Sequence, residues 1–261
     1  MQILVINLDR STDRWRHMQD QFAKLGLACE RIPAIDGRQS GAIPLQSGQW
    51  RFLKPTEIAC FLSHGKCWEY FLEGNSEYAA VFEDDIYLSD NAADILSGRM
   101  AIPRDIGILK LETFASPVRL SKHSLHSWEG YDIHRLHSSH FGAAGYIMSR
   151  RAAEIIVSLS RQGTLDPVDT FLFGRRGAFW KKNEVFQLSP AICVQSTLDR
   201  RGEHIFQTTI EYENPIRRRF GLHQKAWREI SRVIDDATDM LQSRKRTTAV
   251  VPFGRPAKKA G

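Results

Sequence analysis

The sequence predicts an α/β domain built on a mostly parallel sheet with helices against its faces. Two observations carry this prediction. Short apolar runs alternate with longer segments of helical periodicity over residues 3–194. The first apolar run, the helical segment after it and the next apolar run form a βαβ unit, and this order favours parallel strands.

Strands are expected where apolar, β-branched runs are short. These runs fall at residues 3–8, 30–35, 78–82, 106–111, 131–137, 143–148 and 185–194. The run at 131–137 alternates between apolar and polar residues and predicts an edge strand. Pro190 interrupts the last run, because proline cannot donate to a ladder of backbone hydrogen bonds.

Helices are expected where apolar residues recur every three or four positions. They fall at 12–25, 57–73, 90–96, 149–159 and from 166 onward. Each is preceded or opened by a side chain that can cap the first turn; the candidates are Ser11 or Thr12, Thr56, Asp90, Ser149 and Asp166. Residues 38–54 are rich in Gly, Ser and Gln and predict a loop.

The positive charge is concentrated towards the C-terminus. The chain has 36 Lys and Arg against 30 Asp and Glu, a formal net charge of +6. Residues 215–261 hold 12 basic and 4 acidic residues, so the first 214 carry 24 and 26. We therefore divide the chain into a domain over 1–214, a basic amphipathic helix over 215–243, and a disordered basic tail over 244–261.

The chain shows no export or membrane-spanning signal. Its first apolar run is short, lacks a basic leader and is followed at once by Asp9. We expect a cytoplasmic protein whose 4 cysteines are reduced thiols. The segment 215–243 could also contact an anionic membrane, placing the protein on the inner face of the cytoplasmic membrane. Alternatively, its apolar stripe packs on the domain and its basic face is solvated.

Three adjacent carboxylates, Glu83, Asp84 and Asp85, follow the apolar run at 78–82. In open α/β sheets, ligands bind at the carboxyl ends of strands. In an extended segment Glu83 and Asp85 face one side and Asp84 the other. The pair could face a divalent cation such as Mn²⁺ or Mg²⁺ and the phosphates that it binds. The alternative is a solvated acidic turn.

Polar side chains also follow the first strand. Asn7, Arg10 and Arg14 lie where that strand leads into a helix, an arrangement that favours phosphate but also occurs in solvated surface turns. Ser63 and His64 lie within the helix expected at 57–73. They do not form a nucleophile–base pair, because adjacent residues on a helix point about 100° apart.

Five segments in order resemble glycosyltransferase family 25, the bacterial lipopolysaccharide and lipooligosaccharide galactosyltransferases related to collagen galactosyltransferases. They are INLDRSTDR (6–14), AIDG (34–37), EIACFLSH (57–64), VFEDD (81–85) and DPVD (166–169). The resemblance implies a GT-A-like, Rossmann-like fold, a UDP-sugar donor and a Mn²⁺ requirement. It also implies a saccharide or lipid-linked glycan acceptor, with galactose as the expected hexose. Residues 215–261 lie outside it.

The resemblance also implies roles for individual residues. Asp85 would bind the metal, and Glu83, which stands where a strict DxD motif has its first Asp, would bind ribose or metal-bound water. The nucleotide side would be lined by Asn7, Arg10, Arg14, Asp36, Ser63 and His64. Transfer with inversion requires a base near the acceptor. Asp169 is the candidate, with Asp166 and Glu184 as competitors.

Two other functional classes remain open. The sequence pI of about 9.2 would fit a nucleic-acid-binding protein. The basic C-terminal region, however, interleaves few aromatic residues, and we expect no nucleic-acid partner. A metal-dependent phosphotransferase could use Glu83 and Asp85, but the chain has no glycine-rich phosphate loop.

Overall fold

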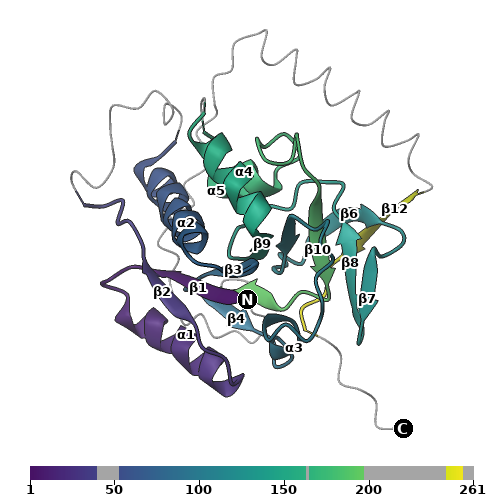
Figure 1. Cartoon of the computed structure of the whole chain (residues 1–261), viewed down its shortest axis with the longest axis horizontal. Helices are drawn as coiled ribbons and strands as arrows, with labels where there is room; N and C mark the ends of the chain where they lie inside the picture. Colours follow the sequence, from purple (N-terminus) through teal and green to yellow (C-terminus); the bar gives the residue numbers. More distant parts are fainter. Residues whose placement is uncertain (40–52, 163–164, 197–244, 255–261) are drawn as a thin grey trace.

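An eight-stranded sheet forms the centre of the computed structural model, which describes residues 1–39, 53–162, 165–196 and 245–254 (Figure 1). The strands are β1 (Gln2–Asn7), β2 (Glu30–Pro33), β3 (Tyr78–Glu83), β4 (Ile86–Leu88), β5 (Ile108–Lys110), β6 (Pro117–Ser121), β7 (His126–Trp128), β8 (Tyr131–Arg135), β9 (Gly145–Ser149), β10 (Val185–Ser189), β11 (Cys193–Gln195) and β12 (Arg246–Val250). The helices are α1 (Thr12–Lys24), α2 (Pro55–Glu73), α3 (Ala93–Leu96), α4 (Arg150–Ser160) and α5 (Val168–Phe173).

The strand order of the main sheet is β2-β1-β3-β9-β5-β10-β8-β7. β1 pairs in parallel with β2 and β3, and β10 pairs in parallel with β5. β9 lies antiparallel between β3 and β5, and β8 lies antiparallel between β10 and β7. Within this sheet, all strands other than β9 and β8 therefore share one direction, which confirms the predicted α/β class. The edge prediction for 131–137 is wrong, because β7 covers the outer side of β8.

Helices cover both faces of this sheet (Figure 1). Leu4 and Ile6 of β1 pack in one apolar core with residues of α2, α4 and α5. Ile3 and Val5 of the same strand pack in a second core with residues of α1 and α3. This alternation follows from the two-residue period of a strand. It explains why β1 is a nearly uninterrupted apolar run, since both of its faces are buried.

Several predicted helix caps differ from the observed ones. Ser149 caps α4 as predicted, because its hydroxyl accepts a hydrogen bond from Ala152 N at 3.2 Å. α2 begins at Pro55, one residue before Thr56, since proline fits the first helical position, where no N–H partner is needed. α3 begins at Ala93, and its N-cap position is Ala92, not Asp90.

The C-terminal tail contributes a strand to the folded body. β12 pairs antiparallel with β6, Val251 is buried, and the Thr113 hydroxyl donates to Val251 O at 2.7 Å. The prediction of a disordered tail is therefore wrong for residues 245–254. The Pro, Gly, Lys and Arg content of 244–261 concealed a short β-branched run, RTTAVV at 246–251. The helix predicted at 215–243 lies outside the described residues.

None of the helices in the described ranges combines the length and the apolar sequence that spanning a bilayer requires.

Candidate active site

A pocket lies at the carboxyl ends of β1 and β3, beside α2. Its walls come from the turns after β1, β2 and β3, from one face of α2, and from the end of β11. The lining residues are Ile6, Leu8, Arg10, Arg14, Ala34–Arg38, Thr56, Ala59, Cys60, Ser63, His64, Glu83–Asp85 and Gln195. Parallel strands end at the same edge of a sheet, which is why segments far apart in sequence meet here. The structure thus brings together most of the sequence-predicted site residues.

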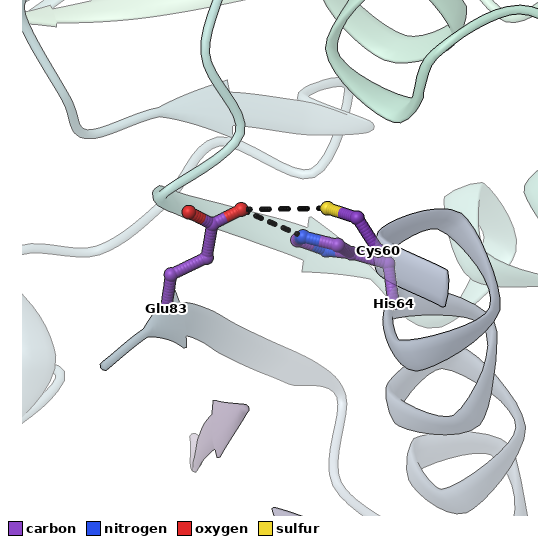
Figure 2. A group of neighbouring side chains, drawn as sticks. All are labelled: Cys60, His64 and Glu83. Carbon is purple, nitrogen blue, oxygen red and sulfur yellow. Dashed lines mark hydrogen bonds and ion pairs between the residues drawn. The ribbon is translucent and has the colours of Figure 1, made fainter. Parts of the chain in front are cut away.

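Glu83, the last residue of β3, is held by side chains from two other elements. One carboxylate oxygen, Oε1, lies 3.3 Å from His64 Nε2 and 3.9 Å from the Cys60 thiol on α2 (Figure 2). The other oxygen, Oε2, accepts a hydrogen bond from Gln195 Nε2 at 3.3 Å. These contacts fix the direction of the carboxylate within the pocket.

A chain of buried hydrogen bonds holds His64 in place. Trp68 Nε1 donates to the Tyr146 hydroxyl oxygen at 2.8 Å, and that hydroxyl lies 3.0 Å from His64 Nδ1. A carboxylate can only accept, so we assign to His64 Nε2 a proton that it donates to Glu83. The chain of hydrogen bonds thus runs from Trp68 to the pocket.

The pKa of Glu83 is set by opposing effects. Burial raises the pKa, but the hydrogen bond and charge of His64, the hydrogen bond from Gln195 and the charge of Lys110 outweigh burial. The net pKa lies below the ordinary value of a glutamate. Glu83 is therefore an anion and an acceptor in the pocket.

Asp84 turns towards β1 and α1. It accepts from Asn7 Nδ2 at 2.6 Å and from Arg14 Nη1 at 3.0 Å. Asn7 is almost fully buried and lies behind the pocket wall, where its Oδ1 also accepts from Arg31 Nε at 2.7 Å. Asn7 therefore supports the acidic turn, and its contact with a nucleotide, which the resemblance implied, stays a prediction.

Asp85 has a carboxylate oxygen without a hydrogen-bond partner. Its Oδ2 lies 3.7 Å from Arg14 Nη1, whereas its Oδ1 is buried and receives no hydrogen bond from the described part of the chain. Burial, followed by the charge of Glu83, raises the pKa of Asp85 to about 7, although Arg14 opposes the shift. A buried carboxylate oxygen among other acids is suited to a cation.

Arg10, Asp36 and Ser63 also line the pocket. Arg10 Nε is 3.2 Å from Asp36 Oδ2, and its side chain is 39% exposed, so the guanidinium reaches the open part of the pocket. Ser63 accepts from Ile35 N at 2.8 Å and donates to Ala59 O at 2.6 Å. Its hydroxyl therefore fastens the turn after β2 to α2.

A buried ion pair, absent from the sequence-based site, lies at the end of β5. Lys110 Nζ is 3.0 Å from Glu112 Oε2, and both side chains are fully buried. Lys110 also donates to the carbonyl oxygens of Phe141 and Gly142. Burial raises the pKa of Glu112 to about 7, although Lys110 opposes the shift. The pair fastens the loop at 141–142 to the sheet.

That loop contacts Asp169, the residue predicted to act as the base. Gly142 N donates to Asp169 Oδ2 at 3.3 Å, while Oδ1 accepts from Thr170 N at 2.6 Å. Asp169 does not line the pocket. Its charge nevertheless reaches Cys60: burial, followed by the charges of Glu83, Asp169 and Asp85, raises the pKa of the Cys60 thiol. Asp169 therefore lies within electrostatic range of Cys60 on the pocket wall.

The competitor Glu184 lies at the other end of the molecule. It precedes β10, whose direction matches β3, so it is at the amino edge of the sheet. Its carboxylate pairs with Arg135 at 2.5 Å, and both side chains are about half exposed. This position excludes Glu184 as the base. Asp166, which lies just before α5, remains a competitor of Asp169.

Sequence reasoning missed four residues in or next to the site. Cys60 carried a readable signal, since it lies four positions before His64 and therefore on the same helix face. Lys110 and Glu112 follow a predicted strand, as the acidic triplet does, and could have been weighed in the same way. Gln195 gave no local signal, because β11 reaches the pocket through its pairing with β4.

The model of glycosyltransferase family 25, described as an LPS biosynthesis protein family, matches residues 1–172. The chain belongs to glycosyltransferase family 25. The matched range includes the pocket residues from β1 to β3, the ion pair on β5 and Asp169. The family places the protein among glycosyltransferases, which confirms the resemblance noted in the sequence.

Curated relatives agree with this membership. The chain is 31% identical over 210 residues to the lacto-N-neotetraose biosynthesis glycosyltransferase LgtB of Neisseria meningitidis, with 75% of this chain and 74% of the relative covered. It is 28% identical over 204 residues to the lipooligosaccharide biosynthesis protein lex-1 of Haemophilus influenzae, covering 75% and 67%. A glycosyltransferase 25 family member of Drosophila pseudoobscura is 28% identical, with 77% and 35% covered.

Proposed function

We propose that this glycosyltransferase transfers a hexose from a UDP-sugar to a saccharide of the lipopolysaccharide or lipooligosaccharide core. Galactose is the hexose that we propose first, and transfer proceeds with inversion at the anomeric carbon. The observation that supports this most is the pocket, where three adjacent acids meet Arg10 and Arg14 at the carboxyl ends of β1 and β3. Two of the relatives are named for lacto-N-neotetraose and lipooligosaccharide biosynthesis, which supports a glycan acceptor of this kind.

The acidic turn fits a hard divalent cation, Mn²⁺ or Mg²⁺. Asp85 offers a buried oxygen without a partner in the described part of the chain, and Glu83 is an anion on the same turn. Carboxylate oxygens are the ligands that such ions prefer. Asp85 would hold the ion, with Glu83 next to it. When bound, the ion would supply Lewis-acid stabilisation of the departing diphosphate.

The chain's own residues have separate tasks around that turn. Arg14 and Asn7 donate hydrogen bonds to Asp84, so their role is to stabilise the acidic turn and not to bind the nucleotide. Arg10 is the more exposed guanidinium and can donate to a phosphate once it leaves Asp36. His64 and Gln195 orient Glu83, which can then accept a hydrogen bond from a ribose hydroxyl.

Asp169 is our proposed general base. Its Oδ2 accepts one long bond from Gly142 N, so a lone pair remains available for the acceptor hydroxyl proton. The Lys110–Glu112 pair supports Asp169 indirectly, through the carbonyl groups of the 141–142 loop. In this arrangement Lys110 acts as a positioning residue and makes no contact with substrate.

The test is a screen of UDP-sugars for release of UDP, with and without Mn²⁺ and a lipooligosaccharide acceptor. We expect UDP-galactose to give metal-dependent release that rises when acceptor is added. No release from any UDP-sugar would refute the donor class. Release that favours UDP-glucose or a UDP-N-acetylhexosamine would correct the sugar alone.

We also propose that the basic segment 215–243 contacts an anionic membrane surface, where a lipid-linked acceptor lies. Its charge supports this proposal, as RRR at 217–219 precedes an amphipathic sequence. Because β12 packs on the body, truncation before residue 215 would also remove a strand. The appropriate variant replaces Arg217, Arg218 and Arg219 with Glu. Its flotation with anionic liposomes should fall, while equal flotation would refute the contact.

A further inference from the structure

One corner of the pocket brings together a thiol, an imidazole and a carboxylate (Figure 2). The ligand atoms of Cys60, His64 and Glu83 all lie within 4.8 Å of one another. Among the residues that the structure describes, no other group of three or more His, Cys, Asp and Glu side chains is gathered so closely. We propose that these three residues bind a thiophilic divalent cation, with Zn²⁺ as the fitting ion.

The distances are close to those of a tetrahedral zinc site. Zinc binds cysteine sulfur at about 2.3 Å and histidine nitrogen or carboxylate oxygen at about 2.0–2.2 Å, which separates neighbouring ligands by about 3.3–3.7 Å. The observed separations are 3.3 Å from His64 Nε2 to Glu83 Oε1 and 3.9 Å from Cys60 Sγ to the same oxygen. Small side-chain rotations are sufficient to enclose an ion.

The backbone places the three ligands close together. Cys60 and His64 are four residues apart on α2, so one helix face presents both. Glu83 faces them from the end of β3, and Gln195 fixes its second oxygen. Zinc sites depend on such outer partners to orient their ligands. Two of the three ligands therefore come from one helix, and the third is already restrained.

The protons balance without another reactant. Binding releases the Cys60 thiol proton to solvent, because the thiolate is the ligand. The His64 proton moves from Nε2, which must bind the ion, to Nδ1. There it faces the Tyr146 hydroxyl oxygen at 3.0 Å, which can accept as well as donate. Three protein ligands leave a fourth position for water or a ligand oxygen.

This site differs from the proposed site for a hard cation at Asp85. Sulfur and imidazole favour Zn²⁺ over Mg²⁺ and Mn²⁺, which prefer oxygen. The two sites share Glu83, so Zn²⁺ at Cys60 would withdraw Glu83 from the nucleotide. We therefore expect Zn²⁺ to inhibit transfer when Mn²⁺ is in excess. The binding claim itself does not rest on the proposed donor.

The test is titration of the full chain with Co²⁺, a coloured substitute for Zn²⁺, in the absence of nucleotide. We expect a thiolate-to-cobalt charge-transfer band in the wild type that added Zn²⁺ abolishes. Cys60→Ser should lack the band. Cys29→Ser should keep it, since Cys29 is half-buried like Cys60 but lies outside the pocket. Glu83→Gln should weaken Co²⁺ binding by at least about 10-fold, because the loss of even an outer partner of a ligand costs about 10–100-fold in affinity.

A second measurement needs no variant and so does not depend on variant folding. Zn²⁺ should slow alkylation of Cys60 in the wild type but leave Cys29 unaffected, as read by mass spectrometry of the cysteine peptides. A wild type without the cobalt band, a band that survives in Cys60→Ser, or equal alkylation with and without Zn²⁺ would each overturn the site. UDP release would be unaffected by that failure, so the two proposals can fail separately.

Discussion

The buried Lys110–Glu112 pair provides the sharpest stability prediction. Lys110→Met keeps the aliphatic part of the side chain but removes its charge. Among the described residues, Glu112 then keeps one hydrogen bond, from Ala144 N at 3.1 Å. The carbonyl groups of Phe141 and Gly142 lose a donor as well. Removing one partner of a buried pair costs about 3–5 kcal/mol, because the remaining charge has no compensation. We expect a loss of this size at pH 8.

The loss should grow with pH. The pKa of Glu112 is about 7 in the folded wild type, above the ordinary value of about 4.5 for a glutamate. Its favourable effect on stability is therefore complete below about pH 4.5 and is lost as pH rises through 7. Lys110 holds that pKa down, so Lys110→Met raises it further. Above pH 7 the variant therefore loses up to about 1.4 kcal/mol more per pH unit than the wild type.

The assay is urea unfolding at pH 6 and pH 8, followed by circular dichroism. The Lys110→Met, Glu112→Gln double variant should recover part of the loss, because it leaves no buried charge. Arg135→Met is the matched control. It breaks an ion pair whose side chains are 48% and 51% exposed, and it should cost less than about 1 kcal/mol. A Lys110→Met cost below that of the control, or equal at both pH values, would refute the reasoning.

Three further predictions concern the same region. Asp169→Asn should lower transfer by about 10²–10⁴-fold while UDP binding stays within a few-fold, and transfer within tenfold of the wild type would move the base elsewhere. Gly142→Ala should cost at least about 1–3 kcal/mol in urea unfolding, since an added Cβ would lie 2.0 Å from the Phe114 ring at φ +88°; an unchanged midpoint would contradict this packing. Burial, followed by the charge of Lys110, lowers the pKa of His140 to about 3. The free energy of unfolding should therefore fall by up to about 1.4 kcal/mol per pH unit as the pH drops below about 6.5. His140→Gln should flatten that slope.

Local patterns were sufficient for most of the fold. The alternation of buried runs and amphipathic segments predicted β1, α1, β2, α2 and β3 with small errors at their ends. The pairing of distant strands was not predictable in this way. The sequence of residues 145–149 does not indicate that β9 lies antiparallel between β3 and β5. The short run at 246–250 forms a strand by pairing with β6, which is distant in sequence.

The candidate site was likewise predictable where it depends on local sequence and not where it depends on the pairing of distant strands. Arg10, Arg14, Glu83 and Asp85 were each predicted at the end of a strand, where ligands bind, and the family resemblance joined them into one site. Their individual roles were not predictable: Arg14, for example, donates a hydrogen bond to Asp84. Residues that arrive through β5 and β11 required the strand order of the sheet. A sequence can thus indicate where a site lies before it indicates what each side chain does.

The most direct test of the account is calorimetric titration of UDP into the wild type and Asp85→Asn, each with and without Mn²⁺. We propose that the metal-dependent part of nucleotide binding depends on the oxygen of Asp85 that is buried without a partner in the described residues. We predict that Mn²⁺ tightens UDP binding to the wild type and has no effect on Asp85→Asn, whose thermal unfolding stays cooperative. Equal Mn²⁺ enhancement in both proteins, or none in the wild type, would contradict the central claim.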